Sequence, residues 1–351
     1  MSEEDERSRA GAAGFVSDVG ERLDAGIRSG LLRDLHAVVA ARGGATVLER
    51  YWSGVDQAWG EPLGVVSFGP ETLHDLRSVT KSVVGLLYGI ALGRGLVPPP
   101  DAPLMAQFPE YPDLVGDETR GGITVAHALT MTLGTEWNED LPYTDPANGE
   151  IAMEMAPDRY RFVLERPVVE PPGTRWTYSG GAVALLGALL ARGTGMPLPD
   201  FARETLFAPL GIADFVWMAG RDGVASAASG LRLTARGLLA IGQMVAAGGV
   251  HGGRQVVPAS WIAASFTPHV PTGDGLDYGY LWFLGSGRAP AFAEPKPWAA
   301  GFGNGGQRLC VMPEAGLAAV IFAGQYDRAD TAWIAPNRVW NEIIVGNLER
   351  A

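Results

Sequence analysis

Lysine is almost missing from this chain of 351 residues. Only Lys81 and Lys296 occur, whereas 25 arginines carry the remaining basic charge. A guanidinium group stays protonated at any working pH, so arginine cannot replace lysine where a proton must be taken up and released. The pKa of a lysine can be shifted by burial or by a neighbouring charge. A lysine kept beside a reactive side chain in such a chain therefore indicates chemistry.

Cysteine and histidine are also scarce. The single Cys310 excludes an intrachain disulfide, and its apolar neighbours predict a buried strand thiol. The five histidines are scattered without the spacing of metal ligands, so no metal site is implied. The glycine-rich run at residues 301–306 does not open a helix and departs from the dinucleotide-binding spacing. We therefore expect neither a metal nor a cofactor.

Two further absences limit the partners. The net charge of -12 argues against nucleic acid or an anionic membrane. No apolar run reaches the about 18 residues that a membrane span needs, and the acidic residues 1–7 do not resemble a secretory signal. We expect a cytoplasmic protein whose partner is a small-molecule ester or amide, and a homodimer is compatible with this composition.

The order of patterns along the chain predicts the fold class. Residues 37–41 and 45–51, separated by a glycine turn, predict a β-hairpin, and strand patterns return near the C-terminus. Helical patterns alternate with Pro/Gly-rich loops in between. This order predicts an α/β (α+β) fold, with an antiparallel sheet flanked by helices and an inserted, mainly helical lobe. The expected division is residues 1–100 and 251–351 for the sheet domain and 101–250 for the helical domain.

An apolar helix is predicted over residues 78–92, and it begins with a serine and a lysine. Apolar residues cover most of its circumference, which is typical of a buried helix. Ser78 and Lys81 lie at positions i and i+3, so they share one face and the hydroxyl can approach the amine. A serine hydroxyl is a poor nucleophile until a base takes its proton. At the start of a helix it also lies near the positive end of the dipole, which favours developing negative charge.

Tyr178 is the expected second base. It follows a Pro-Gly loop in the segment 171–179. Lysine and tyrosine ordinarily titrate near about 10.4 and about 10, too high for neutral pH. Placed side by side, the ammonium group favours the phenolate, and burial disfavours the ammonium group. A packed aromatic residue whose hydroxyl caps a turn is the alternative interpretation of Tyr178 taken alone.

These features resemble the serine β-lactamase-like, penicillin-binding-protein-type hydrolases. The likeness is greatest to the branch that contains class C β-lactamases, family VIII carboxylesterases and 6-aminohexanoate-dimer hydrolases. Ser-x-x-Lys is a signature of the related class A enzymes and penicillin-binding proteins. The resemblance runs over residues 72–322 and rests on the segments 77–82, 123–130, 172–179, 206–212 and 305–307.

The resemblance implies a role for each motif. Ser78 would be the acylated nucleophile, Lys81 would hold it and help to move its proton, and Tyr178 would be the general base. One oxyanion donor would be the Ser78 backbone amide. Counting back from residues 305–307 makes Gly301 the other donor and places Trp298 in the third motif, where it is a candidate wall of the cleft.

Two departures from the family pattern bear on the substrate. The second motif is often Tyr-x-Asn, but Gly180 stands at its third place and offers no amide side chain. The third motif, Lys-Thr-Gly in β-lactamases, is missing, and Lys296 lies two places off its register between two prolines, which suit a strand interior badly. Without that lysine the site lacks the cation that would bind the carboxylate of penicillins and of D-Ala-D-Ala peptides. This favours an esterase or amidase acting on less anionic substrates.

The expected reaction is two-step acyl transfer through Ser78, by a carboxylesterase acting on short or medium acyl esters. An amidase of the 6-aminohexanoate-oligomer type and a weak β-lactamase or DD-peptidase remain alternatives. A non-catalytic binding module that kept the fold is an alternative of another class. No Gly-x-Ser-x-Gly is present, which disfavours an α/β-hydrolase. The loop 137–148, with Asp140 and Asp145, is a candidate cover for the site, although a solvated loop is the simpler expectation.

Overall fold

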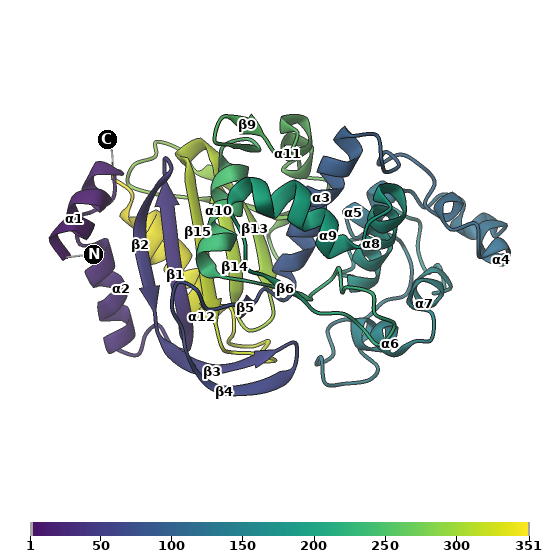
Figure 1. The fold of residues 1–351 in the computed structure, drawn as a ribbon, viewed down its shortest axis with the longest axis horizontal. Coiled ribbons are helices and arrows are strands. Elements are labelled where there is room, and N and C mark those ends of the chain that lie inside the picture. Colours follow the sequence, from purple (N-terminus) through teal and green to yellow (C-terminus); the bar gives the residue numbers. More distant parts are fainter. Residues whose placement is uncertain (1–2, 350–351) are drawn as a thin grey trace.

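A computed structural model describes residues 3–349, and its largest element is an eight-stranded antiparallel sheet (Figure 1). β1 pairs with both β2 and β15, so strands from the two ends of the chain lie side by side. This confirms the expected sheet and its N-terminal hairpin. In spatial order the strands are β10 (Val270–Pro271), β11 (Asp277–Tyr278), β12 (Phe283–Gly287), β13 (Lys296–Gly303), β14 (Gln307–Met312), β15 (Leu317–Ala323), β1 (Leu35–Arg42) and β2 (Ala45–Tyr51).

The sheet is buried on both faces because helices cover each of them. Alternate residues of a strand point to opposite faces, and in β15 Val320 joins one core cluster whereas Ile321 joins the other. The first cluster holds α3 (Val79–Gly93) and α10 (Ala235–Ala246). The second holds α1 (Glu3–Ala12), α2 (Val19–Arg28) and α12 (Ile334–Arg338). Cys310 lies in the second cluster and is 2% exposed, as its apolar neighbours predict.

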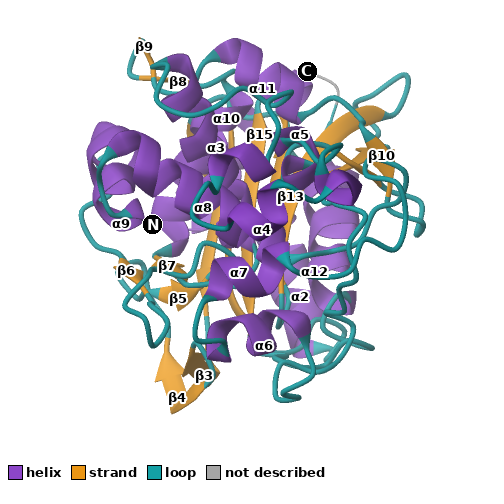
Figure 2. Cartoon of the chain, turned by 90° about the vertical axis from the view of Figure 1, so that its right-hand side faces the viewer, coloured by secondary structure: helices purple, strands orange, loops and turns teal. Residues whose placement is uncertain are grey.

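A group of helices, called here the helical lobe, packs beside α3 at the right of Figure 1 and faces the viewer in Figure 2. The apolar α8 is its central helix and shares the first core cluster with α3. The lobe consists of α4 (Pro112–Val115), α5 (Val125–Leu129), α6 (Gly149–Met155), α7 (Arg159–Leu164), α8 (Gly180–Thr194) and α9 (Leu198–Ala202).

α10 lies within the residues expected for the helical domain, but it packs on the sheet. A Cβ atom added to Gly242 would lie 2.8 Å from Leu309 and 3.1 Å from Ala318. The two lobes also share one apolar core, and the division at residues 101 and 250 stays a prediction. α11 (Ala259–Ser265) packs against α3 on the same side of the sheet.

Three small strand groups lie outside the main sheet, and the sequence patterns did not indicate them. They are β3 (Ser53–Ala58) with β4 (Glu61–Ser67), β5 (His74–Asp75) with β7 (Leu231–Leu233) and β6 (Val216–Trp217), and β8 (Val250–His251) with β9 (Arg254–Gln255). The second group fixes the start of α3, because β5 pairs with β7 and the Leu76 amide donates to the Leu231 carbonyl.

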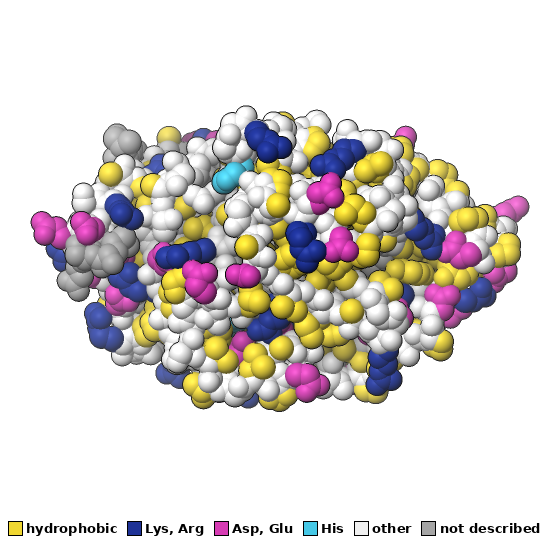
Figure 3. Space-filling model, in the orientation of Figure 1, with side chains coloured by type: hydrophobic (Ala, Val, Ile, Leu, Met, Phe, Trp, Pro, Cys, Tyr) yellow, Lys and Arg dark blue, Asp and Glu magenta, His cyan; other side chains and the backbone are white. Residues whose placement is uncertain are grey.

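The end of the chain is less regular than one long helix. It consists of α12, followed by a π-type segment Val339–Ile344 and a 3-10 turn Val345–Asn347. Within residues 3–349, no single helix has the length and apolar character to cross a membrane; only Gly180–Thr194 and Leu198–Leu210 taken together do, and they are bent by 74°. On the face drawn in Figure 3, basic and acidic side chains are interspersed, so this face offers no continuous basic surface for a polyanion.

Candidate active site

Ser78 is the N-cap residue of α3, at the junction of the sheet and the helical lobe. Lys81 Nζ donates to Ser78 Oγ at 2.9 Å and to the backbone carbonyl of Ala228 at 2.9 Å. Ser78 is 7% exposed and Lys81 only 1% exposed, because the rest of α3 is embedded in the core. The helix therefore places a buried amine within hydrogen-bonding distance of the hydroxyl, as the i, i+3 spacing predicts.

Tyr178 joins this pair from just before α8. Its phenol interacts electrostatically with both Ser78 and Lys81, and Lys81 Nζ lies 4.9 Å from the centroid of its ring. Trp176 and Phe283 hold the ring, with centroids 5.8 Å and 6.3 Å away. The structure thus brings a hydroxyl, an amine and a phenol together around a site where a proton can be exchanged.

A buried glutamate of α6 contacts the lysine from the other side. Glu150 Oε2 lies 3.5 Å from Lys81 Nζ, and Glu150 Oε1 accepts a hydrogen bond of 2.5 Å from the Ser229 hydroxyl. Glu150 is 3% exposed. It lies in the first turn of α6, where the Asn148 side chain caps the helix by accepting from the Glu150 amide at 3.0 Å. A buried carboxylate of this kind is stable only when it is paired and hydrogen-bonded, as it is here.

A second glutamate, Glu139, lies beside the first and meets the start of α8. It accepts hydrogen bonds from the Gly180 amide and from Trp137 Nε1. A Cβ atom added to Gly180 would lie 2.6 Å from Glu150 Oε2 and 2.9 Å from Glu139 Oε1. The two carboxylates therefore occupy the room that a side chain at position 180 would need.

Burial and the neighbouring ionisable groups, Tyr178 and the two glutamates around Lys81, set the charge state of the site. Burial disfavours the Lys81 ammonium group, but the negative groups around it outweigh this effect and raise the pKa of Lys81. Burial also raises the pKa of Tyr178, against the opposing influence of Lys81. The mutual shifts expected from the sequence are present, but the net direction is upward for both groups. In the free site Lys81 is an ammonium group and Tyr178 a neutral phenol.

A cavity of about 270 Å³ opens onto Ser78. Trp59, Ile151 and Met155 make its apolar wall. The cavity is smaller than most pockets for drug-sized ligands, so it suits a short chain or a single ring. Its polar lining consists of Gln57, Arg77, Tyr143, Thr144, Glu150, Glu154, Ser229, Asn304 and Asp327.

A family model described as Beta-lactamase matches residues 28–335, which is most of the chain. The chain belongs to the Beta-lactamase family. The matched span includes Ser78, Lys81 and Tyr178, and it confirms the resemblance drawn from the sequence motifs.

Curated relatives of this chain include proteins named as a hydrolase and as an esterase. The 6-aminohexanoate-dimer hydrolase of Paenarthrobacter ureafaciens is 28% identical over 207 residues, which are 56% of this chain and 51% of that protein. Esterase EstB of Burkholderia gladioli is 28% identical over 213 residues, which are 58% of this chain and 52% of that protein. The alignments thus span about half the length of these relatives.

Solved structures confirm the Beta-lactamase fold. The putative 6-aminohexanoate-dimer hydrolase from Bacillus anthracis superposes with a TM-score of 0.70 at 18% identity, covering 88% of this chain and 79% of that one. EstCE1, described as a hydrolase with promiscuous acyltransferase activity, gives 0.69 at 16% identity, covering 97% and 99%.

Trp298, expected at a wall of the cleft, lies on the opposite face of the sheet from α3. It packs against the second core cluster, as do Ala300 and Phe302 two and four residues on in β13. No contact joins Trp298 to Ser78 among the described residues. Its predicted role with substrate therefore finds no support in this placement.

Gly301 does face α3, but slightly beyond Ser78. A Cβ atom there would lie 2.8 Å from Ser82 Oγ and 3.2 Å from Val79. The corresponding atom on Gly303 would lie 2.4 Å from the Leu76 carbonyl oxygen. Ser78 falls between these contacts, so both glycines are candidates for the second oxyanion donor, and Gly301 stays a prediction.

Lys296 does not reach the site. Its Nζ pairs with Glu314 Oε2 at 2.6 Å at the far end of β13. The acidic residues of the loop 137–148 that meet the site are also different from those considered in the sequence. Asp140 is exposed and the Asp145 carboxylate accepts from the Ala147 amide, whereas Glu139 accepts from the Gly180 amide, two residues after Tyr178.

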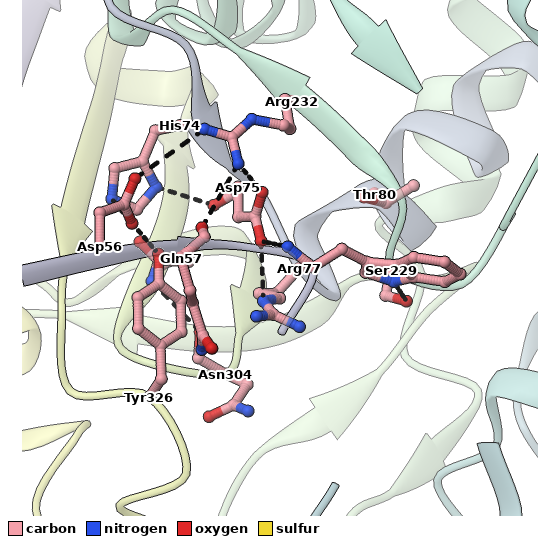
Figure 4. A network of polar contacts seen from close by, with 12 residues as sticks. Asp56, Gln57, His74, Asp75, Arg77, Thr80, Ser229, Arg232, Asn304 and Tyr326 are labelled. Atoms are coloured by element: carbon pink, nitrogen blue, oxygen red, sulfur yellow. Dashed lines mark hydrogen bonds and ion pairs between the residues drawn. The ribbon is translucent and has the colours of Figure 1, made fainter. Parts of the chain in front are cut away.

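One cluster has the ligand types of a metal site, which the scattered histidines did not suggest. Donor atoms of His36, Asp56 and His74 lie within 4.8 Å of one another. Burial lowers the pKa of His36 to about 4 and that of His74 to about 3, so both rings are neutral. His36 Nδ1 lies 2.9 Å from His74 Nε2. Asp56 accepts a hydrogen bond from the Tyr326 hydroxyl and pairs with Arg232 (Figure 4). One Asp56 oxygen is thus engaged by Tyr326, whereas Oδ2 lies 3.9 Å from Arg232 and accepts no hydrogen bond among the described residues.

Stability should depend on pH through Glu139. Burial and the neighbouring Glu150 raise the pKa of Glu139 to about 7, whereas an unfolded glutamate titrates near about 4.3. The folded protein thus holds the extra proton between these values, and the stability it brings is complete below about 4.3 and lost as pH rises through about 7. We expect the melting temperature of wild type to fall over this range more steeply than that of Glu139→Gln. Glu136→Gln, an exposed change in the same loop, should melt like wild type, and equal slopes in all three proteins would contradict the assignment.

Proposed function

We propose that this protein is a serine hydrolase that forms an acyl-enzyme on Ser78 and acts as a carboxylesterase on short or medium acyl esters. The observation that carries the proposal is the 2.9 Å contact between the buried Lys81 Nζ and Ser78 Oγ, beside the partly buried Tyr178 and at the edge of a cavity. A non-catalytic binding module would have no need for this arrangement.

The reaction uses one proton-transfer group twice. Ser78 Oγ attacks the ester carbonyl while the Tyr178–Lys81 pair takes its proton, and the same pair then gives that proton to the departing alkoxide. Water loses a proton to the pair and attacks the acyl-enzyme; the bond from the acyl carbon to Ser78 Oγ then breaks, the pair returns the proton to Ser78 Oγ, and the carboxylic acid leaves. The Ser78 amide and a backbone amide of β13, from Gly301 or Gly303, hold the negative oxygen.

The raised pKa values limit which form of the site is active. Tyr178 and Lys81 are both protonated in the free site, so the pair must lose one proton before it can act as a base. That form is a minority at neutral pH, and its share grows as pH rises. The proposal therefore implies a rate that increases with pH through the neutral range.

An ester is favoured over a penicillin because β13 supplies no lysine to the cavity, Lys296 being paired elsewhere. Amide hydrolysis is the second candidate, favoured by the similarity to a protein named 6-aminohexanoate-dimer hydrolase. A weak β-lactamase or DD-peptidase activity is the third.

Intact-mass measurement after mixing with p-nitrophenyl butyrate tests the proposal. We expect a transient gain of one butyryl group, which peptide mapping assigns to Ser78 and not to the nearby hydroxyls of Thr80 or Ser229. Parallel reactions with the matched p-nitroanilide and with nitrocefin rank the alternatives, and we expect the ester to react fastest. No adduct with any acyl donor would support the binding module, and fast nitrocefin turnover would show that the missing third-motif lysine is not needed.

A further inference from the structure

Arg77, the residue before the nucleophile, directs a buried cation into the same cavity as Ser78. It lines that cavity and is 9% exposed. Its φ is +48°, in the left-handed region that side chains other than glycine rarely adopt. Such strained conformations persist where the surrounding structure enforces them, and they cluster at functional sites. The chain therefore holds this side chain beside the reacting serine at a cost in conformational energy.

One edge of the Arg77 guanidinium is fixed and the other is free. Its Nε lies 3.2 Å from Asp75 Oδ2, as an ion pair without a hydrogen bond, and the group lies over the Tyr326 ring at 5.1 Å from the centroid. Within residues 3–349, no hydrogen bond reaches its two terminal nitrogens, and Figure 4 shows them pointing away from Asp75. Two parallel N–H donors are therefore presented in fixed orientation and without a protein partner.

The carboxylates near Arg77 are engaged elsewhere. Asp75 also accepts from Arg232 at 2.6 Å, so it is shared between two guanidinium groups. Glu150 faces Lys81, and Glu154 pairs with Arg159 at 2.9 Å. Asp327 at the rim is exposed and accepts from the Asn304 amide. None of these groups supplies the pair of oxygens that the free edge of a guanidinium group binds best.

We infer that Arg77 binds a carboxylate of the substrate, so that preferred substrates are esters or amides carrying a free carboxylate near the scissile carbonyl. The inference rests on the proposed function. A guanidinium group can donate two parallel hydrogen bonds to one carboxylate, and this interaction is stronger in a partly buried cavity than in water. The cation that β13 lacks is thus supplied from the start of α3, which qualifies the expectation of less anionic substrates.

Two matched substrate pairs test the inference and locate the carboxylate. The first pair consists of the 4-methylumbelliferyl monoester of adipic acid, whose second carboxylate is free, and the same ester with that second carboxylate converted to a methyl ester. The second compares butyryl esters of 4-hydroxybenzoate and of methyl 4-hydroxybenzoate, which carry the charge on the leaving group. We expect wild type to prefer the charged member of one pair by about tenfold or more in kcat/KM. Arg77→Ala should abolish this preference, and Arg77→Lys should keep part of it.

The controls separate the carboxylate site from a general effect of charge or folding. Arg328→Ala removes an exposed arginine next to Asp327 and should leave the preference unchanged. In Ser78→Ala, which cannot be acylated, calorimetry should show benzoate binding more tightly than benzamide, and adding Arg77→Ala should remove the difference. An unchanged preference in Arg77→Ala, or equal binding of benzoate and benzamide, would overturn the inference. If wild type cleaves neither of the two uncharged, methylated esters, the proposed function fails. The calorimetric comparison of benzoate with benzamide still decides the role of Arg77.

Discussion

Replacing Lys81 with alanine is expected to lower the turnover of a p-nitrophenyl ester by about 10²- to 10⁴-fold. The variant loses the amine that contacts Ser78 Oγ at 2.9 Å and the positive charge that favours a phenolate at Tyr178. Arginine should not rescue it, because guanidinium does not release its proton and is too large for a site that is 1% exposed. Rates of ester hydrolysis measured with equal amounts of folded protein check this, and wild-type rates in the variant would remove lysine from the mechanism.

A double variant shows whether the loss is chemical or structural. Lys81→Ala leaves Glu150 buried without its cation, which destabilises the fold. Adding Glu150→Gln removes the unpaired charge, so the double variant should regain melting temperature without regaining activity. Recovery of activity in the double variant would mean that Lys81 serves only to neutralise Glu150.

Replacing Tyr178 with phenylalanine should lower kcat/KM by about 10²- to 10⁴-fold and remove much of its increase with pH. The ring and its contacts with Trp176 and Phe283 are kept, so the change removes the phenol alone. A pH profile of ester hydrolysis in wild type and variant is the measurement.

Tyr143 provides a matched control for the phenol. It lines the same cavity, and its hydroxyl donates only a long hydrogen bond of 3.4 Å to Glu139. Tyr143→Phe should therefore keep most of the activity and the shape of the pH profile. Equal losses in the two variants would mean that a general change in the cavity, and not the phenol of Tyr178, explains the effect.

The sequence predicted well whatever depends on local geometry. Ser78 and Lys81 share a helix face by their spacing alone, and the apolar helix that follows fixes their burial. The hairpin of β1 and β2 and the apolar pattern of β15 likewise predict a sheet closed by the two ends of the chain. Tyr178 required the resemblance to a family, because 97 residues separate it from Lys81 in the chain.

The sequence failed where a single register or a distant contact decides the outcome. Counting back from residues 305–307 placed Trp298 at the site. Side chains alternate between the two faces of a strand, however, and the Trp298 side chain lies on the face of β13 that points away from α3. Glu139 and Glu150 gave no signal of their own, because acidic residues in a polar loop and a first helical turn are common at surfaces. The N-cap at Asn148 identifies the start of α6, although it does not say what that turn faces.

The close approach at Gly180 constrains how this site can change during evolution. An asparagine at position 180 needs space that the carboxylates of Glu139 and Glu150 fill, since even a methyl group would come within 2.6 Å of one of them. Exchanging the carboxylates alone would leave the Lys81 ammonium without its counter-charge. A site with asparagine at position 180 and a site with the two glutamates therefore cannot be interconverted by single substitutions without loss of stability. We expect positions 139, 150 and 180 to vary together across lineages.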